Sequence, residues 1–313
     1  MSDFKTILKY PLEELKRLQA LSLEDKVTLS KVRIQEWYEN WDGKVCVNFS
    51  GGKDSTVLLH LVRSLYPEVP AVYVDNGMDL KTVREFVKRT PNVVKLKPEM
   101  NFRQVIEKCG WVFPSKDVAQ MVEAAKRGVR YGEMYLQGKN ADGRPSVVKE
   151  DRYARWRHLL NAPFKISPKC CDELKEKPLA KYHRETGQKP YVGLLASESK
   201  RRQQSWQRAG CNAFDSASPK SRPLMFWTEQ DILRYIRDEN LPIAEAYGEI
   251  IEKKGKLETA CEHRTGCIFC LIGAHRDKPN RIQRLKYLEP EKYRYCLEQL
   301  GMREVLEWLK IPY

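Results

Sequence analysis

Six consecutive residues have the types and spacing of a phosphate-binding loop. The segment from Ser50 to Ser55 reads Ser-Gly-Gly-Lys-Asp-Ser, between an apolar run at 44–49 that suits a buried strand and an apolar run at 56–62 that suits a helix. Two glycines let the backbone turn and approach a ligand, and the N-terminus of a helix favours an anion. The predicted phosphate-binding residues are Ser50, Gly51, Gly52, Lys53, Asp54 and Ser55.

Each polar side chain of this loop has its own expected role. Ser50 and Ser55 add hydroxyl donors, Lys53 adds a positive charge, and Asp54 is a candidate ligand for a phosphate-bound Mg²⁺. Lys53 and Asp54 are therefore the candidate catalytic residues. The loop is not a kinase-type P-loop, because no glycine stands five residues before Gly52. A glycine turn that binds nothing is the alternative.

Four cysteines in two short-spaced pairs are candidate metal ligands: Cys170, Cys171, Cys267 and Cys270. Four thiolates brought together hold a [4Fe-4S] cluster or a tetrahedral zinc ion. An adjacent Cys-Cys pair is awkward around one tetrahedral ion, so we expect the cluster. Two alternatives stay open. Cys261 and His263 could complete a local zinc site with the Cys-x-x-Cys pair, or Cys261 could replace one of the adjacent pair as an iron ligand.

Composition and charge limit the classes of protein to which this sequence can belong. The 313 residues are 42% hydrophobic, which is enough to bury a full core. Because the sequence starts without an apolar signal segment and has no run of 18 apolar residues, we expect a cytoplasmic protein with no membrane partner. The formal net charge of +14 favours polyanionic partners or substrates, and a solvated basic surface is the alternative.

Strands that alternate with helices predict an α/β fold with a doubly wound parallel sheet. Candidate strands lie at 44–49, 71–74, 92–95 and 191–195, and candidate helices at 79–89, after Cys171, from Thr228 and from about Arg281. Residues 1–42 are interpreted as an N-terminal helical segment, 43–245 as a nucleotide-binding domain and 246–313 as a cysteine-bearing helical extension. The glycine-rich stretch 127–151 is interpreted as an exposed loop, either a lid or a surface insertion.

The loop after its strand resembles the pyrophosphate loop of the adenine-nucleotide α-hydrolase superfamily. Members of that superfamily cleave ATP between the α and β phosphates or bind adenylylated sulfate. The resemblance implies that ATP or a related adenine nucleotide lies across the strand ends, where ligands bind in open α/β sheets. It also makes Asp75 and Gly77, which follow the second strand, candidates for adenosine contacts.

A second resemblance covers residues 40–275. The segment Lys169 to Leu179 is similar to the first cysteine pair of the adenylylsulfate and phosphoadenylylsulfate reductases, and Arg222 to Ile232 is similar to their Pro-Leu, Trp-Thr and Asp segment. In those reductases a Cys-Cys pair and a distant Cys-x-x-Cys pair bind a [4Fe-4S] cluster. An Arg-rich segment at the position of Arg201 and Arg202 contacts the anionic part of the substrate.

Two departures distinguish this sequence from those reductases. They carry a nucleophilic cysteine near the C-terminus, whereas this sequence ends at Tyr313 without one, and Cys296 is interpreted as a packed helical residue. Their phosphate loop is usually degenerate, whereas the loop from Ser50 to Ser55 is intact. Both departures favour an ATP pyrophosphatase-type sulfur-transfer enzyme. It would adenylylate a substrate such as tRNA or DNA and receive sulfur from a donor such as a cysteine desulfurase.

Two other functions remain as alternatives. One is reduction of adenylylsulfate or its 3′-phosphorylated form to sulfite with a thioredoxin-like reductant. The other is a non-catalytic module that binds nucleotide and nucleic acid and contains structural zinc. Arg201, Arg276 and Arg281 are the candidate phosphate contacts for a nucleic acid, and an ordinary helix with a basic face is the alternative for the run that follows His275.

Overall fold

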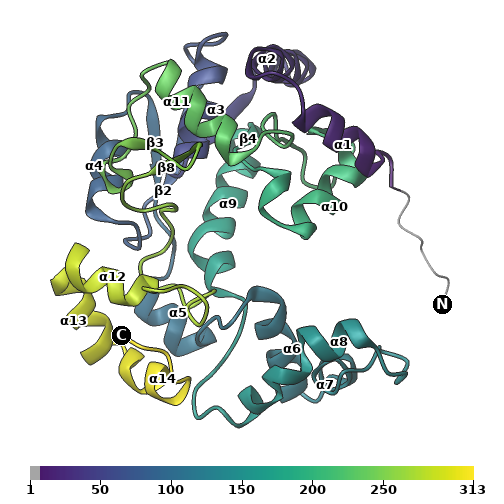
Figure 1. Cartoon of the computed structure of the whole chain (residues 1–313), viewed down its shortest axis with the longest axis vertical. Coiled ribbons are helices and arrows are strands. Elements are labelled where there is room, and N and C mark those ends of the chain that lie inside the picture. Colours follow the sequence, from purple (N-terminus) through teal and green to yellow (C-terminus); the bar gives the residue numbers. More distant parts are fainter. Residues whose placement is uncertain (1–7) are drawn as a thin grey trace. The chain divides into compact units, whose positions relative to one another are not determined.

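A computed structural model describes residues 8–313, which form two compact units (Figure 1). Unit 1 contains the chain up to Val74 together with Lys81–Leu96 and Leu179–Thr265, and unit 2 contains Asp75–Leu80, Lys97–Pro178 and Gly266–Tyr313. The predicted domains divide the chain at single positions, near 43 and 246, whereas the two compact units interleave along the sequence.

Unit 1 is built on a six-stranded sheet with the order β3-β2-β1-β4-β6-β5. The strands are β1 (Val45–Asn48), β2 (Ala71–Val74), β3 (Val93–Leu96), β4 (Lys189–Val192), β5 (Asn212–Ala213) and β6 (Lys220–Ser221). Every neighbouring pair is parallel except β5 and β6. In the register of the central strand, Val47 lies opposite Ala71 of β2 and Tyr191 of β4. The predicted α/β fold with a mostly parallel sheet is confirmed.

Helices and a short hairpin complete unit 1. The longer helices are α1 (Leu12–Gln19), α2 (Leu23–Asn40), α3 (Lys53–Arg63), α4 (Lys81–Arg89), α10 (Lys200–Ala209) and α11 (Glu229–Asp238). Helix α9 (Lys177–Thr186) begins in unit 2 and continues into unit 1, and the remaining elements are η3 (Ala196–Glu198), η4 (Glu245–Tyr247), β7 (Ile250–Lys253) and β8 (Lys256–Thr259). Helix α3 packs against β1 and β4, and α2 and α11 pack against α3. The helix predicted from Thr228 is α11, and Thr228 is its N-cap.

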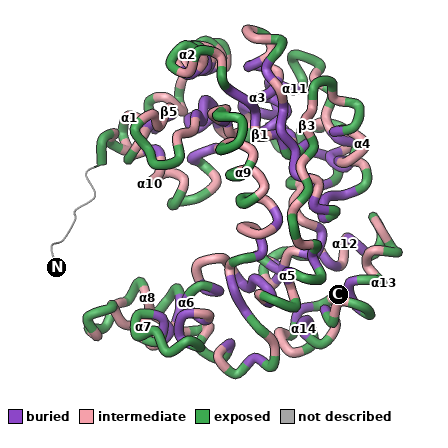
Figure 2. Tube along the Cα trace, turned by 180° about the vertical axis from the view of Figure 1, so that it is seen from behind, coloured by how far each residue is buried: buried purple, intermediate pink, exposed green. Residues whose placement is uncertain are grey.

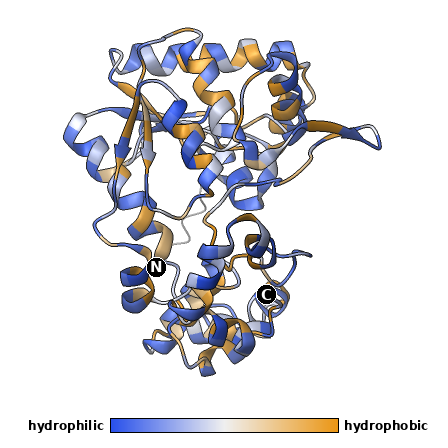
Figure 3. Ribbon diagram, turned by 90° about the vertical axis from the view of Figure 1, so that its left-hand side faces the viewer, coloured by the Kyte–Doolittle hydropathy of each residue, from blue (hydrophilic) through white to orange (hydrophobic). Residues whose placement is uncertain are grey.

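Strand β1 is enclosed on both faces, as expected for a central strand of a parallel sheet. Val45 and Val47 belong to a buried cluster that also contains Trp37 and Tyr191. Asn48, one position on, points to the opposite face and lies 3.0 Å from Nε2 of His183 on α9. The buried strands appear purple in Figure 2, and their hydrophobic residues appear orange in Figure 3. Packing on both faces fixes the end of β1 and therefore the start of the loop that follows it.

We expect His183 to make the stability of unit 1 sensitive to pH. Burial, together with the positive charges of Lys189 and Lys220, lowers the pKa of His183 from 6.5 to about 4. Between these two values the unfolded chain binds a proton that the folded chain does not, so stability falls as the pH drops from about 6.5 towards 4. We expect denaturant titrations across this range to show the loss. His183→Gln, whose amide can hydrogen-bond to Asn48 without titrating, should flatten it; an unchanged pH dependence would contradict the assignment.

Unit 2 is largely helical. Its helices are α5 (Phe102–Cys109), α6 (Lys116–Lys126), α7 (Arg130–Leu136), α8 (Val147–Arg152), η1 (Ala154–Asn161), η2 (Asp172–Glu176), α12 (Arg281–Leu288), α13 (Pro290–Glu298) and α14 (Met302–Trp308). The interpretation of 127–151 as a loop was therefore wrong, since this stretch contains α7 and α8. Over residues 8–313, no helix is both long enough and apolar enough to cross a membrane.

Gly132 explains why the sequence of α7 looked like a turn. A Cβ atom at this position would lie 2.6 Å from the backbone nitrogen of Ala125 and 2.7 Å from the carbonyl oxygen of Met121, both on α6. The glycine therefore permits close packing of two helices and does not mark a chain reversal. Ser146 supplies an ordinary N-cap for α8, because its side chain accepts a hydrogen bond from the Lys149 backbone N–H.

Candidate nucleotide site and cysteine group

The loop from Ser50 to Ser55 connects the end of β1 to the first turn of α3, with Gly52 as the N-cap. Gly51 has a φ of +69°, and a Cβ there would lie 2.8 Å from side-chain atoms of both Val83 and Val87 on α4. Only glycine tolerates both the backbone conformation and the contact. The loop thus brings the N-terminus of an eleven-residue helix to the carboxyl edge of the sheet, which is the position predicted for a phosphate site.

The two serines hold the shape of the loop. The Ser55 hydroxyl donates to the Gly52 carbonyl oxygen at 2.8 Å and accepts from the Ser50 backbone N–H at 3.2 Å. The Ser50 hydroxyl accepts from the Gly52 N–H at 3.3 Å and lies 3.1 Å from the Ser55 hydroxyl. Both hydroxyls therefore bind within the loop, and their predicted contacts to a phosphate remain predictions.

Lys53 is buried and surrounded by acceptors. Its Nζ donates to the carbonyl oxygen of His263 at 3.2 Å and pairs with Glu229 at 3.2 Å and with Asp54 at 3.6 Å. The side chain is 4% exposed. These partners keep the ammonium beside the first turn of α3, where its charge can act on a bound anion.

Asp54 has the properties of a cation ligand. Its Oδ1 atom is buried and accepts no hydrogen bond from any described residue, and its nearest cation is Lys53 Nζ at 3.6 Å. A buried carboxylate oxygen without a donor is costly unless something else satisfies it. Hard divalent cations such as Mg²⁺ prefer such oxygens, so the donor chemistry fits the predicted magnesium role.

Arg201 and Arg202 differ in how exposed they are. Arg201 is exposed on α10, whereas Arg202 is partly buried and forms an ion pair with Glu198, which Arg264 also contacts at 2.5 Å. Burial lowers the pKa of Arg202, the charge of Arg264 lowers it further, and the carboxylate of Asp54 opposes both. The charge of Asp54 thus acts on Arg202, and the predicted substrate contacts of Arg201 and Arg202 remain predictions.

Two functional candidates that sequence analysis missed are Tyr247 and Thr265. The Lys53 backbone N–H donates to the Tyr247 hydroxyl at 3.0 Å, and that hydroxyl lies 2.8 Å from the Thr265 hydroxyl. The nearest local signal is Gly248, which follows Tyr247 with a φ of +65°. Nothing in that signal points to a loop 194 residues earlier in the chain.

Asp75 and Gly77 follow β2 directly and belong to unit 2. Between them, Asn76 is buried and its side-chain oxygen accepts from the Met78 N–H at 2.9 Å, which shapes the turn. Gly77 has a φ of +73°, and a Cβ there would contact nothing within 4 Å. The positive φ, and not a close contact, therefore explains why position 77 is a glycine. The predicted adenosine contacts of Asp75 and Gly77 remain predictions.

The four predicted cysteine ligands all lie in unit 2 and are electrostatic neighbours. Burial raises the pKa of Cys170 most, and the charges of Cys267, Cys171 and Cys270 raise it further. Burial likewise raises the pKa of Cys267 to about 11, against the opposing charge of Lys175. These are thiols that stay protonated at neutral pH unless a metal or a cation stabilises the thiolate.

Two lysines supply positive charge to this cysteine group. Burial by itself lowers the pKa of Lys175, but the charges of Cys267 and Asp79 and a hydrogen bond to Cys267 outweigh it and raise the pKa. The ammonium of Lys175 also lies 3.9 Å from Asp79. Lys116 lowers the pKa of Cys171 against the larger effect of burial. The group therefore combines four thiols with cations that favour their ionised form.

The arrangement of the donors bears on which metal the group could hold. Within residues 8–313, no three or more His, Cys, Asp or Glu side chains are arranged to hold a metal ion. Thiolates around a [4Fe-4S] cluster bind separate irons and lie farther apart than those around one ion. The four neighbouring thiols are the donor type that a [4Fe-4S] cluster requires, and their role as its ligands remains a prediction. Cys261 is exposed and lies with His263 in unit 1.

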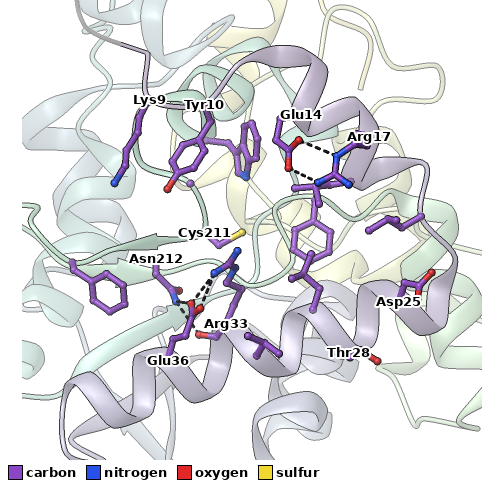
Figure 4. Close-up of a pocket in the computed structure, with 18 residues that line it drawn as sticks. Lys9, Tyr10, Glu14, Arg17, Asp25, Thr28, Arg33, Glu36, Cys211 and Asn212 are labelled. Atoms are coloured by element: carbon purple, nitrogen blue, oxygen red, sulfur yellow. Dashed lines mark hydrogen bonds and ion pairs between the residues drawn. The ribbon is translucent and has the colours of Figure 1, made fainter.

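A cavity of about 640 Å³ lies elsewhere in unit 1, between α1, α2 and α10 (Figure 4). Tyr10, Arg33 and Trp206 line it together with apolar residues of these helices. Four of the charged residues drawn there form two ion pairs, since Glu14 binds Arg17 and Glu36 binds Arg33. None of the predicted site residues lines this cavity.

Comparison with known proteins agrees with the family resemblance of the sequence. A mostly parallel sheet with a glycine loop at the carboxyl end of its central strand is an arrangement found in open α/β nucleotide-binding folds. Residues 44–127 and 118–270 match the family described as the phosphoadenosine phosphosulfate reductase domain. Because these matches span more than half of the sequence, the protein belongs to that family, and the resemblance inferred from the cysteine motifs is confirmed.

Similar proteins include two that are named as phosphosulfate reductases. A phosphoadenosine 5′-phosphosulfate reductase from Vibrio campbellii is 25% identical over 231 residues, covering 73% of this chain and 71% of the relative. An adenosine 5′-phosphosulfate reductase from Staphylococcus epidermidis is 23% identical over 238 residues, covering 74% and 76%. The phosphoadenylyl-sulfate reductase structure from Candida auris, a phosphate complex, aligns with a TM-score of 0.39 and 14% identity over 78% of this chain and 96% of that one.

Proposed function

We propose that this protein is an ATP-dependent sulfur-transfer enzyme that binds the nucleotide at the loop from Ser50 to Ser55. The observation that carries the proposal is the intact loop, with Lys53 held beside it and a buried Asp54 oxygen that accepts no hydrogen bond. An oxygen of the acceptor substrate would attack the α phosphorus of ATP, and the bond from that phosphorus to the β-phosphate oxygen would break. Pyrophosphate would leave, and a sulfide-level donor would then displace AMP.

The residues of the loop have distinct roles in this proposal. The first N–H groups of α3 and the Lys53 ammonium would stabilise negative charge on the departing pyrophosphate. Asp54 would hold a Mg²⁺ ion bound to the phosphates, and a bound Mg²⁺ would supply further charge stabilisation. Arg202, on which the charge of Asp54 acts, would hold the anionic part of the acceptor or of the nucleotide.

The cysteine group would hold a [4Fe-4S] cluster through Cys170, Cys171, Cys267 and Cys270. When bound, such a cluster supplies redox or sulfur-binding chemistry. Lys175 and Lys116 would offset the negative charge of the four thiolates. Cys296, the last cysteine of the sequence, is buried in α13, and burial raises its pKa to about 12, so it is a poor nucleophile.

We expect protein purified without oxygen to be brown and to contain iron and sulfide. Cys267→Ser combined with Cys270→Ser should remove the visible absorbance, since two of four ligands are lost. Cys109→Ser, a matched change of another unit 2 cysteine, should keep the colour. Colourless protein with one zinc per chain, lost on Cys261→Ser, would instead favour the local zinc site.

The proposed acceptor is a polyanion such as tRNA or DNA. The formal charge of +14 and the exposed Arg201 and Arg276 support this choice. Arg281 is less accessible, because its guanidinium donates to the carbonyl oxygen of Cys267 at 3.0 Å and so also braces the cysteine loop. Neutralising phosphates releases counterions, so binding should weaken steeply as salt rises.

One preparation tests this function against its main alternative. The proposed enzyme should release pyrophosphate from ATP in the presence of nucleic acid and bind that nucleic acid in a salt-dependent way. The named relatives favour a second candidate, an adenylylsulfate reductase that forms sulfite from adenylylsulfate with thioredoxin and needs no ATP. Sulfite formation without salt-dependent binding of nucleic acid would overturn the proposal and favour the reductase. Turnover in neither assay would favour the non-catalytic binding module.

A further inference from the structure

The Tyr247 hydroxyl is hydrogen-bonded to the first N–H group of α3. The Lys53 N–H donates to it at 3.0 Å, and Tyr247 is 2% exposed. Its backbone carbonyl accepts from the Cys261 N–H at 3.0 Å, which holds the residue against the following hairpin. Lys53, Tyr247 and Cys261 all belong to unit 1.

The same hydroxyl lies directly over the loop backbone. A Cβ placed on Gly52 would be 3.3 Å from the Tyr247 hydroxyl oxygen and 3.4 Å from the Thr265 hydroxyl oxygen. An anion at a helix N-terminus accepts hydrogen bonds from these first N–H groups. The Lys53 N–H can donate one well-aligned hydrogen bond. A phosphate oxygen and the Tyr247 hydroxyl therefore compete to accept it.

We infer that Tyr247 sets the affinity of the loop for phosphate by competing for the Lys53 N–H. The inference rests on the proposed function of the loop as a phosphate site. When a phosphate oxygen takes the Lys53 N–H, the Tyr247 hydroxyl loses that hydrogen bond and keeps its partner Thr265, 2.8 Å away. Tyr247 thus lowers the affinity for the nucleotide and for the pyrophosphate product, which favours release of product after cleavage.

Calorimetric titration with magnesium pyrophosphate tests this inference. Tyr247→Phe keeps the buried ring and removes only the competing oxygen, so pyrophosphate should bind about five-fold more tightly, the net effect of one hydrogen bond. The matched control is Tyr235→Phe, because the Tyr235 hydroxyl contacts Nδ1 of His60 at 2.9 Å and takes no part in the loop. That control should bind pyrophosphate as the unmodified protein does.

The outcomes separate this inference from the function on which it rests. If the unmodified protein binds pyrophosphate and Tyr247→Phe binds it equally or more weakly, the inference fails and the phosphate site stands. If neither binds pyrophosphate, both fail. An equal gain in both tyrosine variants would also overturn the inference. Thermal unfolding with and without pyrophosphate gives a second readout, in which Tyr247→Phe and Tyr247→Leu should both gain more from the ligand than the unmodified protein.

Discussion

Replacing Lys53 and Asp54 together with alanine is expected to lower ATP-dependent pyrophosphate release at least about 100-fold. The change removes the ammonium beside the first turn of α3 and the carboxylate whose Oδ1 atom accepts no hydrogen bond from the described residues. Both act on charge that develops as pyrophosphate leaves, so the turnover number should fall even at saturating ATP. The measurement is a coupled pyrophosphate assay, with circular dichroism to verify folding.

Asp54→Asn keeps the size of the side chain and removes only its charge, which isolates the magnesium role. Its defect should shrink as the Mg²⁺ concentration rises, because the site is weakened and not filled by another group. Pyrophosphate release at the unmodified rate in the Lys53→Ala and Asp54→Ala double variant would end the ATP proposal.

Lys26→Met is expected to lower the free energy of unfolding by about 3–5 kcal/mol, because it leaves a buried carboxylate without its cation. Nζ of Lys26, on α2, lies 2.7 Å from Asp231 on α11, and the two side chains are 3% and 10% exposed. Asp231 also accepts from the backbone N–H and hydroxyl of Thr228, but neither partner carries charge. Equilibrium unfolding in urea measures the loss.

Two matched variants control for this change. Lys26→Met combined with Asp231→Asn removes both charges and should recover part of the stability. Arg17→Met breaks the exposed pair with Glu14 and should change the unfolding midpoint little. A loss below about 1 kcal/mol for Lys26→Met would show that the buried pair behaves like a surface pair. The variant also controls for Lys53, since a folded Lys26→Met protein should keep its rate of pyrophosphate release.

Local sequence patterns correctly predicted those helices and strands whose formation depends mainly on neighbouring residues. The apolar run before Ser50 predicted β1 to within a residue, and the helix predicted from Thr228 begins there, with a capping box between Thr228 and Asp231. The same local reasoning failed at Gly132, because a glycine needed for helix packing has the same sequence signal as one needed for a turn. The sequence therefore predicted the order of helices and strands, but it did not predict which of their residues are in contact in the folded chain.

The candidate site also has parts that the sequence predicts locally and parts that depend on contacts between distant residues. The loop from Ser50 to Ser55 was found from its own residues, whereas its contacts to Tyr247, Thr265 and Glu229 depend on folding of distant segments. Arg201 and Arg202 could not be told apart by sequence, because their difference is one of direction on α10. Only the folded chain shows that Arg202 is the more buried of the two and that the charge of Asp54 acts on it.

The sheet topology has a consequence for synthesis of the chain on the ribosome. Val45 of β1 pairs with Lys189 of β4, and the whole of Lys97–Pro178, which belongs to unit 2, is translated between these two strands. Until β4 emerges, one edge of the apolar strand β1 has no partner strand, and unpaired apolar edges promote aggregation. Pairing across so long a stretch of chain is slow to form. Yield in cells should therefore depend on chaperones that bind nascent chains and on the rate of translation between these two strands.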